Sequence, residues 1–449
     1  MTCSCIGVSG LDLEAMRTRL REGQLNALRQ LLPDKAILDA CERAGYVYRR
    51  RLLTPLVTVL HYLSAAIWPE DSFQAAAACA GLDVSSGSLS KARQRLPREV
   101  IDKLEAYVAG LGQGLSEPYA FQQGFRLVSI DGTCLSMEDT PQLRGHFGVV
   151  NTRHGKSKYP EGRLVVASLV KTGTILAHRL GPYRTSEQAL GLGLLASLRS
   201  GDLLVADAHF AGSNLYWRYM QRGLDFITPA HQRLKIKRLR RIRRYRDGSF
   251  VARVPVWKSH RKKHPYLPEA MTLRFVPVRL RSRRKRPVTH LVTSLLDADS
   301  HGAQTIRELY AQRWPVETTF AELKHPLSAD VLRSKGVEGV YKEVATKVTA
   351  LNLVRCLMLQ AAERHKCDPA RLSFAQCRRV TICYSLRMSS APIRLLCGLF
   401  DEMLRHMAFV VNPSRPGRIE PRAVRRETKH FQRLKTSRRE WRRKHALVA

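Results

Sequence analysis

The order of predicted strands and helices between Phe125 and Thr228 is the feature that most limits the fold. Three β-like runs are followed by a helix, a strand, a helix and a strand. These segments are Phe125–Ile130, Leu164–Lys171, Thr174–Leu180, Ser186–Leu198, Leu203–Ala206, Ser213–Gln221 and Asp225–Thr228. Ser186 is a favourable N-cap, and Glu187 suits the first helical turn. Strands that give way to alternating helices and strands predict an α/β layer architecture.

Regions of different composition surround this α/β core. We expect a helical N-terminal region that binds DNA, a first part of the core, a β-rich basic insertion, a second part of the core, a helical C-terminal region and a basic tail. The corresponding residues are 1–122, 123–230, 231–290, 291–340, 341–410 and 411–449. From Gln232 to Arg246 the insertion has nine basic residues and no acidic one. The helices of residues 340–410 are a possible dimer interface.

A helix–turn–helix pattern is present near the N-terminus. Ser72–Ala80 and Ser88–Leu96 have helical spacing, and glycines lie between them. The second helix carries Lys91, Arg93 and Arg95, which could face DNA. An ordinary helical hairpin with a solvated basic face explains the pattern equally well, so both interpretations stay open.

The charge of the chain indicates a polyanionic partner. Lysine and arginine total 76 against 38 acidic residues, which gives a net charge of +38. Nucleic acid is the first candidate partner and an anionic membrane the second. The most apolar stretch, Leu52–Trp68, is interrupted by Thr54, Pro55, His61 and Ser64, and no run of 18 apolar residues occurs. We therefore expect no membrane span.

The cysteines and the N-terminus favour a reducing compartment. The ten cysteines are scattered and contain no C-x2-C unit, so their spacing disfavours a zinc site. Asp12 and Glu14 lie where a secretory signal would be apolar. The expected location is therefore the bacterial cytoplasm, with free thiols and in association with DNA.

Two aspartates come at the ends of predicted strands. Asp131 closes the first strand and Asp207 the fourth. Open α/β folds place ligands at the carboxyl ends of strands, so neighbouring strands would bring these carboxylates together. Converging carboxylates repel each other unless a cation lies between them. Hard oxygen ligands suit Mg²⁺ or Mn²⁺, and two such ions about 3.5–4 Å apart can cleave a phosphodiester. Alternatively, Asp131 is a turn residue and Asp207 an N-cap.

A third group of candidate residues lies between Tyr310 and Lys324. Tyr310, Arg313, Glu317 and Lys324 are spaced by three, four and seven residues. At about 100° per residue, Glu317 and Lys324 share one helix face. Pro315 either kinks a continuous helix or begins a new one at its first position. Alternatively, these residues are ordinary surface residues on a solvated helix face.

The Y-x2-R-x3-E-x6-K spacing from Tyr310 to Lys324 resembles the DDE transposases of the bacterial insertion-element-four family. Ser129-Ile-Asp-Gly-Thr133 resembles the first-aspartate strand of that family. Gly201-Asp-Leu-Leu-Val-Ala-Asp-Ala-His-Phe210 resembles its second-aspartate strand. The third acidic residue follows a β-strand insertion, as in that family. The resemblance covers roughly Phe125 to Lys335.

The resemblance implies a cut-and-paste DNA transposase with an RNase H-like catalytic core. It assigns two divalent ions, Mg²⁺ or Mn²⁺, to Asp131, Asp207 and Glu317. It assigns contacts with DNA phosphates to Tyr310, Arg313 and Lys324, which suits the chemistry of these side chains. It further implies terminal inverted repeats and target DNA as partners, a homodimer on paired ends, and a hairpin route.

The resemblance leaves two alternatives open for each of three further residues. Trp314 could stack on an exposed base, although packing of its helix onto the sheet is the commoner use of a tryptophan. Trp257 could hold a flipped base, although an aromatic residue in a strand usually packs. His209 stands in Ala208-His209-Phe210, where many relatives have Arg-Gly-Phe; it either replaces a lost phosphate contact or is a turn residue.

Two other functions fit the same residues. A basic DNA-binding regulator could keep an inactive RNase H-like core, and a nuclease of the same fold could cut DNA without strand transfer. Replacement of the three acidic residues separates the first from a transposase. Only a transposase, and not the nuclease, joins a pre-cut end to target DNA.

Overall fold

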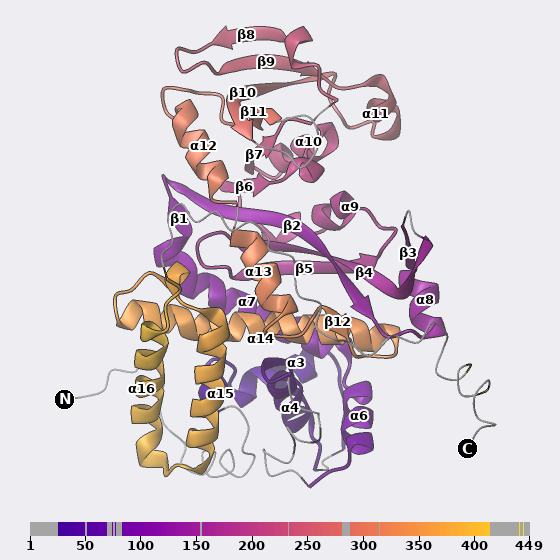
Figure 1. Cartoon of the computed structure of the whole chain (residues 1–449), viewed down its shortest axis with the longest axis vertical. Coiled ribbons are helices and arrows are strands. Elements are labelled where there is room, and N and C mark those ends of the chain that lie inside the picture. Colours follow the sequence, from indigo (N-terminus) through magenta and orange to yellow (C-terminus); the bar gives the residue numbers. More distant parts are fainter. Residues whose placement is uncertain are drawn as a thin grey trace. The chain divides into compact units, whose positions relative to one another are not determined.

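We describe the fold from a computed structural model, shown in Figure 1. It describes residues 26–49, 52–69, 74, 77, 83–152, 155–231, 233–280, 288–313, 315–413, 440 and 443. The chain divides into two compact units, Met1–Val411 and Asn412–Ala449. Most of the second unit, the predicted basic tail, lies outside the described residues. All elements named below belong to the first unit.

Twelve strands of the described residues are joined in one sheet, which is mostly antiparallel. Its main path runs in the order β3-β4-β2-β6-β7-β11-β10-β9-β8; β1 and β12 pair with β2, and β5 pairs with β4. The strands are β1 Phe121–Gln122, β2 Phe125–Met137, β3 Val149–Thr152, β4 Gly155–Leu169, β5 Ile175–Pro182, β6 Asp202–Ala206, β7 Asp225–Pro229, β8 Arg240–Arg244, β9 Phe250–Pro255, β10 Ala270–Leu280, β11 Val288–Thr293 and β12 Val331–Leu332.

Strands β2, β6 and β7 are parallel neighbours at the centre of the sheet. Every residue of β6 is buried, as expected for a parallel strand covered on both faces. Leu204 and Ala206 pack in one hydrophobic cluster, and Leu203 and Val205 in another. Helix α10 (Ser213–Gln221) contributes to the first cluster and α12 (Ala303–Ala311) to the second. The α/β architecture predicted from the sequence is therefore present.

Strand β2 does not end at Asp131 as we predicted. It continues to Met137, and Asp131 lies opposite Val166 of β4. The Asp-Gly pair resembles a turn, but β4 begins as early as Gly155 and offers hydrogen-bond partners along this stretch. The turn interpretation of Asp131 is therefore wrong.

The basic insertion extends the same sheet. Strands β8, β9 and β10 continue it beyond β11, each antiparallel to its neighbour. Strand β11 in turn pairs with β7. Between β9 and β10, the insertion also contains a short helix, α11 (Lys258–Lys263). The three strands of the insertion therefore form one outer end of the sheet, visible at the top of Figure 1.

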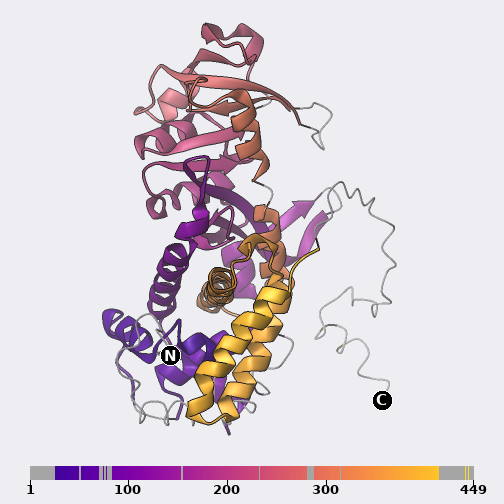
Figure 2. The ribbon, with the colours of Figure 1, turned by 90° about the vertical axis from the view of Figure 1, so that its left-hand side faces the viewer.

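Helix α14 (Val337–Arg364) is the longest helix of the described residues. Its middle is buried on all sides, against α4 (Pro55–Ile67), α7 (Arg98–Ala120), α15 (Phe374–Ser390) and α16 (Leu396–Phe409). A helix with this pattern belongs to a core. The middle of α14 is therefore part of this core, and the dimer interface over residues 340–410 stays a prediction. Figure 2 shows α15 and α16 lying side by side, in yellow.

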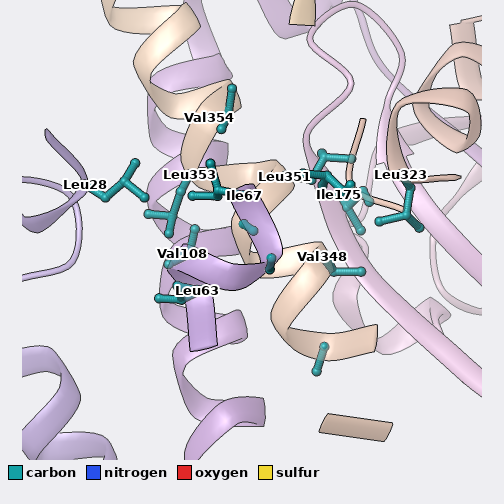
Figure 3. Close-up of a cluster of buried hydrophobic side chains, with 14 of the residues drawn as sticks. Leu28, Leu63, Ile67, Val108, Ile175, Leu323, Val348, Leu351, Leu353 and Val354 are labelled. Carbon is teal, nitrogen blue, oxygen red and sulfur yellow. The ribbon is translucent and has the colours of Figure 1, made fainter. Parts of the chain in front are cut away.

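Side chains from both ends of the first unit share one hydrophobic core. Leu28 and Ile67 from the N-terminal helices pack in the same cluster as Leu351 of α14 and Ile175 of β5 (Figure 3). The other helices are α2 Asn26–Arg29, α3 Asp34–Arg43, α6 Ser86–Arg95, α8 Pro141–Phe147, α9 Glu187–Leu192 and α13 Pro315–Lys324. Among the described residues, no helix is both long and apolar enough to cross a membrane.

The helix–turn–helix pattern is only partly described. The first predicted helix, Ser72–Ala80, lies outside the described residues except for residues 74 and 77. The second is α6, with Lys91 and Arg95 exposed. The Arg93 guanidinium instead lies 4.2 Å from the centre of the Tyr62 ring. Arg93 is therefore committed to packing, which leaves two of the three predicted basic residues facing solvent.

Candidate active site

Asp131 and Asp207 are placed together by the pairing of β2 with β6. Ile130 is the register partner of Ala206, so the next residue on each strand is one of the two aspartates. Neighbouring strands lie about 4.8 Å apart. The two strands are therefore neighbours, which is the condition under which the sequence analysis expects the carboxylates to converge, and both side chains are half-buried.

Asp131 is held by a backbone amide and a guanidinium. Its Oδ1 accepts a hydrogen bond of 2.8 Å from the Gly132 N–H, and its Oδ2 lies 3.3 Å from Arg313 Nη1. Burial raises the pKa of Asp131 to about 6, and the nearby negative charges of Asp207 and Glu187 act in the same direction. The amide and Arg313 oppose that rise. The site thus concentrates negative charge in a partly desolvated place.

Asp207 lies directly after β6 and caps a 3-10 helix, Ala208–Phe210. Its Oδ1 accepts a hydrogen bond of 2.8 Å from the His209 N–H. The N-cap alternative is therefore correct. It is compatible with a role in the site because, among the described residues, only Oδ1 of this carboxylate accepts a hydrogen bond. His209 is exposed, and its carbonyl accepts a hydrogen bond of 2.7 Å from Gln188.

Arg313 connects the first aspartate with the predicted glutamate. Its Nη2 lies 3.8 Å from Glu317 Oε1, while Nη1 contacts Asp131. Helix α12 ends at Ala311 and Pro315 begins α13 at its first position, so the second of the two alternatives for Pro315 is correct. Glu317 remains half exposed in this arrangement. Within the described residues, no group of three ligand side chains is already arranged around a metal position.

Of the other two residues predicted to contact DNA phosphates, Tyr310 lies beside the acidic residues and Lys324 lies at the far end of α13. Tyr310 is at the end of α12, packed against a hydrophobic cluster, and burial raises its pKa. The charges of Arg313, Asp131 and Asp207 also act on it, which places it beside the site. Lys324 Nζ instead lies 3.9 Å from Asp330 Oδ1, at the end of α13.

Trp314 and Trp257 are the two tryptophans that the sequence analysis proposes as base contacts. Trp314 lies outside the described residues. Trp257 is 64% exposed just before α11, so it does not pack against the sheet as a strand aromatic usually does. Its ring is therefore available to a partner.

Our sequence prediction missed Glu187 as a part of this site. It is the first residue of α9, and its Oε1 lies 3.7 Å from Arg163 Nε. The side chain covers Gly132: a Cβ at that glycine would lie 2.9 Å from Glu187 Cγ. A glycine within a strand often marks such a close approach, so the Asp131-Gly132 pair was the signal available.

Residues 122–353, slightly more than half of the chain, match the family described as the transposase DDE domain. The chain belongs to that family. It is 26% identical over 351 residues to the transposase InsG for insertion sequence element IS4 of Escherichia coli (strain K12), and the match covers 76% of each chain. A cryo-EM structure of the piggyBac transposase synaptic complex with hairpin DNA aligns with 88% of this chain and 86% of that chain, at 12% identity and a TM-score of 0.40.

The resemblance to IS4-type DDE transposases is therefore confirmed. The protein is a DNA transposase, an enzyme whose partner is DNA. Enzymes of this family use divalent metal ions. The matched region spans all four acidic residues described above and ends within α14.

Proposed function

We propose that Asp131, Asp207 and Glu317 are the metal-binding carboxylates of this transposase. The observation that carries the proposal is the parallel register of β2 and β6, which sets the two aspartates side by side. Arg313 then links Asp131 to Glu317. We assign two ions, Mg²⁺ or Mn²⁺, to this site, because the donors are hard carboxylate oxygens.

We also propose that the central strands form an RNase H-like core. The order β5-β4-β2-β6-β7, in which β4 alone runs opposite to the other four strands, supports this. The core would then be made of residues 123–230 and 291–340, and residues 231–290 would be the insertion. Helix α14 crosses the expected end of the second part at residue 340.

The donor set fits a divalent cation. Burial raises the pKa of Asp131 and the charge of Asp207 acts in the same direction, so a cation between the two carboxylates would favour their ionised forms. A bound divalent ion would activate water or a 3′-hydroxyl and stabilise the leaving oxygen of a phosphodiester. Asp131, Asp207 and Glu317 would hold the ions in place, and the ordered sheet would keep the two aspartates from moving apart.

Five further residues would contact the DNA. Arg313 offers a planar fork for a phosphate, Tyr310 a hydroxyl and Lys324 a point charge. We propose that these three contact phosphates near the cleavage position, and that Trp314 stacks on a base or packs α13. The exposed Trp257 is suited to holding a base that leaves the duplex.

We further propose a cut-and-paste reaction through a DNA hairpin, carried out by a homodimer on paired inverted repeats with subsequent joining to target DNA. These steps rest on the resemblance to the family. No covalent enzyme intermediate is needed, since one carboxylate site can serve both water and a 3′-hydroxyl.

Replacement of the three acidic residues tests the assignment. Asp131→Asn, Asp207→Asn and Glu317→Gln should each abolish cleavage of an inverted-repeat duplex in Mg²⁺ or Mn²⁺, and should spare binding of that duplex in EDTA. Asp401→Asn and Glu402→Gln on α16 are matched controls that should cleave normally. Cleavage that survives in all three variants would show that the carboxylates are misassigned.

The same assay separates the rival functions. A wild-type protein that binds the duplex but never cleaves it would be a regulator with an inactive core. A protein that cleaves but cannot join a pre-cut end to target DNA would be a nuclease of the same fold. The transposase joins the end, and this joining should be lost in the three acidic variants.

A further inference from the structure

The outer edge of the sheet carries an unusual arrangement of positive charge. All five residues of β8, Arg240–Arg244, are exposed, and four of them are arginines. Strand β8 pairs with β9, and Arg240 lies directly opposite Arg253, which is also exposed. Side chains opposite each other in neighbouring antiparallel strands have Cβ atoms about 5 Å apart, and like charges at such positions destabilise a sheet.

Within the described part of the chain, little negative charge offsets this arrangement. No carboxylate there lies within ion-pair distance of Arg240, Arg244 or Arg253. Asp299 lies 3.9 Å from Arg243, with both side chains well exposed to solvent. Asp247 is occupied by Arg274 and by the backbone N–H groups of residues 249 and 303.

Protection of the sheet edge does not explain the pair. Charged residues on an edge strand prevent unwanted pairing with other strands. Arg253, however, is on β9, which is paired on both sides and has no free edge. An anion that binds between Arg240 and Arg253 would neutralise their charges, and this would explain why the protein keeps two mutually repelling arginines at these positions.

The place of the pair in the sheet indicates which anion. From β6, at the proposed active site, the path to β8 crosses five strand spacings. At about 4.8 Å each this is about 24 Å measured across the strands, which corresponds to at least about seven base pairs of duplex DNA. A duplex whose scissile phosphate lies at Asp131 and Asp207 is a rigid rod long enough to reach both places.

We propose that Arg240 and Arg253 bind the phosphate backbone of the duplex being cut, at least about seven base pairs from the scissile phosphate. The contact is independent of base sequence, because phosphates carry no sequence information. This inference rests on the proposed active site, since the distance is counted from it. It adds a second DNA contact, remote from Tyr310, Arg313 and Lys324.

Reversal of one charge tests the proposal through two opposite readouts. Arg240→Glu places a carboxylate opposite Arg253, so the thermal unfolding midpoint without DNA should rise. Affinity for a long inverted-repeat duplex in EDTA should fall, and the plot of log affinity against log salt should become less steep by about 1 or more. Arg394→Glu, an exposed arginine before α16, makes the same change in net charge and should leave the salt dependence unchanged.

Shortened duplexes locate the contact. The duplex is shortened from one side of the cleavage position in one series and from the other side in a second series. If the cleaved duplex is the ligand, wild type and Arg240→Glu should bind with equal affinity in one of the two series once fewer than about seven base pairs remain on the shortened side. The proposal is overturned if the salt dependence of Arg240→Glu matches that of wild type. It is equally overturned if only capture of target DNA changes, or if the difference persists on duplexes shortened on either side.

Failure of this inference can be told apart from failure of the proposed active site. The binding experiment is done in EDTA and needs no cleavage. The substitution Asp131→Asn reports on cleavage alone. If Asp131→Asn still cleaves, the proposed site is wrong whatever the edge arginines do.

Discussion

The ion pair between Arg126 and Asp202 fixes the register on which the candidate active site depends. The two residues are register partners on β2 and β6. Arg126 Nε lies 2.6 Å from Asp202 Oδ1 and Nη2 lies 2.7 Å from Oδ2, and only 4% and 2% of the two side chains are exposed. Asp202 Oδ2 also accepts a hydrogen bond of 2.9 Å from the Arg199 N–H. The pair lies four residues before Ile130 and Ala206 on the two strands.

Removal of one partner should be costly. Asp202→Ala leaves the Arg126 guanidinium buried without its carboxylate, and such changes destabilise proteins by about 3–5 kcal/mol. Replacing both residues by apolar ones of similar volume, Arg126→Met with Asp202→Leu, should restore most of this, because no buried charge remains. A typical domain is stable by about 5–15 kcal/mol, so the single change removes a large share of that stability.

Urea unfolding provides the measurement, with an exposed pair as the control. Arg144 and Asp139 form an ion pair whose side chains are 43% and 44% exposed, so Asp139→Ala should cost less than about 1 kcal/mol. Cleavage by Asp202→Ala should be lost at temperatures where the control is still active. A free energy of unfolding for Asp202→Ala that equals the Asp139→Ala value would refute the reasoning, as would a double variant less stable than the single one.

Two more predictions concern a histidine and a glycine. Burial lowers the pKa of His178, but the Glu105 carboxylate, 2.6 Å from Nδ1, more than offsets this effect, so the pKa is raised. The ion pair between protonated His178 and Glu105 therefore stabilises the fold fully below about pH 6.5, and this stabilisation is lost as the pH rises through the folded pKa. His178→Gln should remove that slope from the free energy of unfolding measured between pH 6 and 9, and an unchanged slope would contradict the assignment. Gly132→Ala should push the Glu187 side chain aside, since the new Cβ would lie 2.9 Å from Cγ, and should cost about 1 kcal/mol. Adding Glu187→Ala should restore the unfolding midpoint; a double variant no more stable than Gly132→Ala would show that the two side chains do not meet.

The sequence predicted those elements whose boundaries are set locally. The helix Ser213–Gln221 has the predicted bounds, and the strand at Asp225 is one residue longer than predicted. Both are short amphipathic or apolar segments between turn residues. The two aspartates lie side by side because their strands are parallel neighbours, although Asp131 lies within β2 and not at its carboxyl end as the sequence predicted.

Elements whose limits depend on distant partners could not be predicted in the same way. Strand β2 passes through Asp131-Gly132 because β4 supplies partners from more than 25 residues further along the chain. The break between α12 and α13 was one of two possibilities that Pro315 allows, and only tertiary packing selects between them. The ion pair of Arg126 with Asp202 is likewise invisible to local patterns, since 76 residues separate its members.

The charge balance of the site shows most clearly what sequence patterns leave out. Four carboxylates surround it, those of Asp131, Asp207, Glu317 and Glu187, and two guanidinium groups face them, those of Arg313 and Arg163. Because four negative charges meet two positive ones, the formal charge is minus two, in a setting where burial already raises the pKa of Asp131 to about 6. A phosphate cannot approach such a place unless positive charge arrives with it or Arg313 exchanges a carboxylate for the phosphate. Arg313 is therefore the residue whose ion pairs we expect to change if a phosphate enters without a cation.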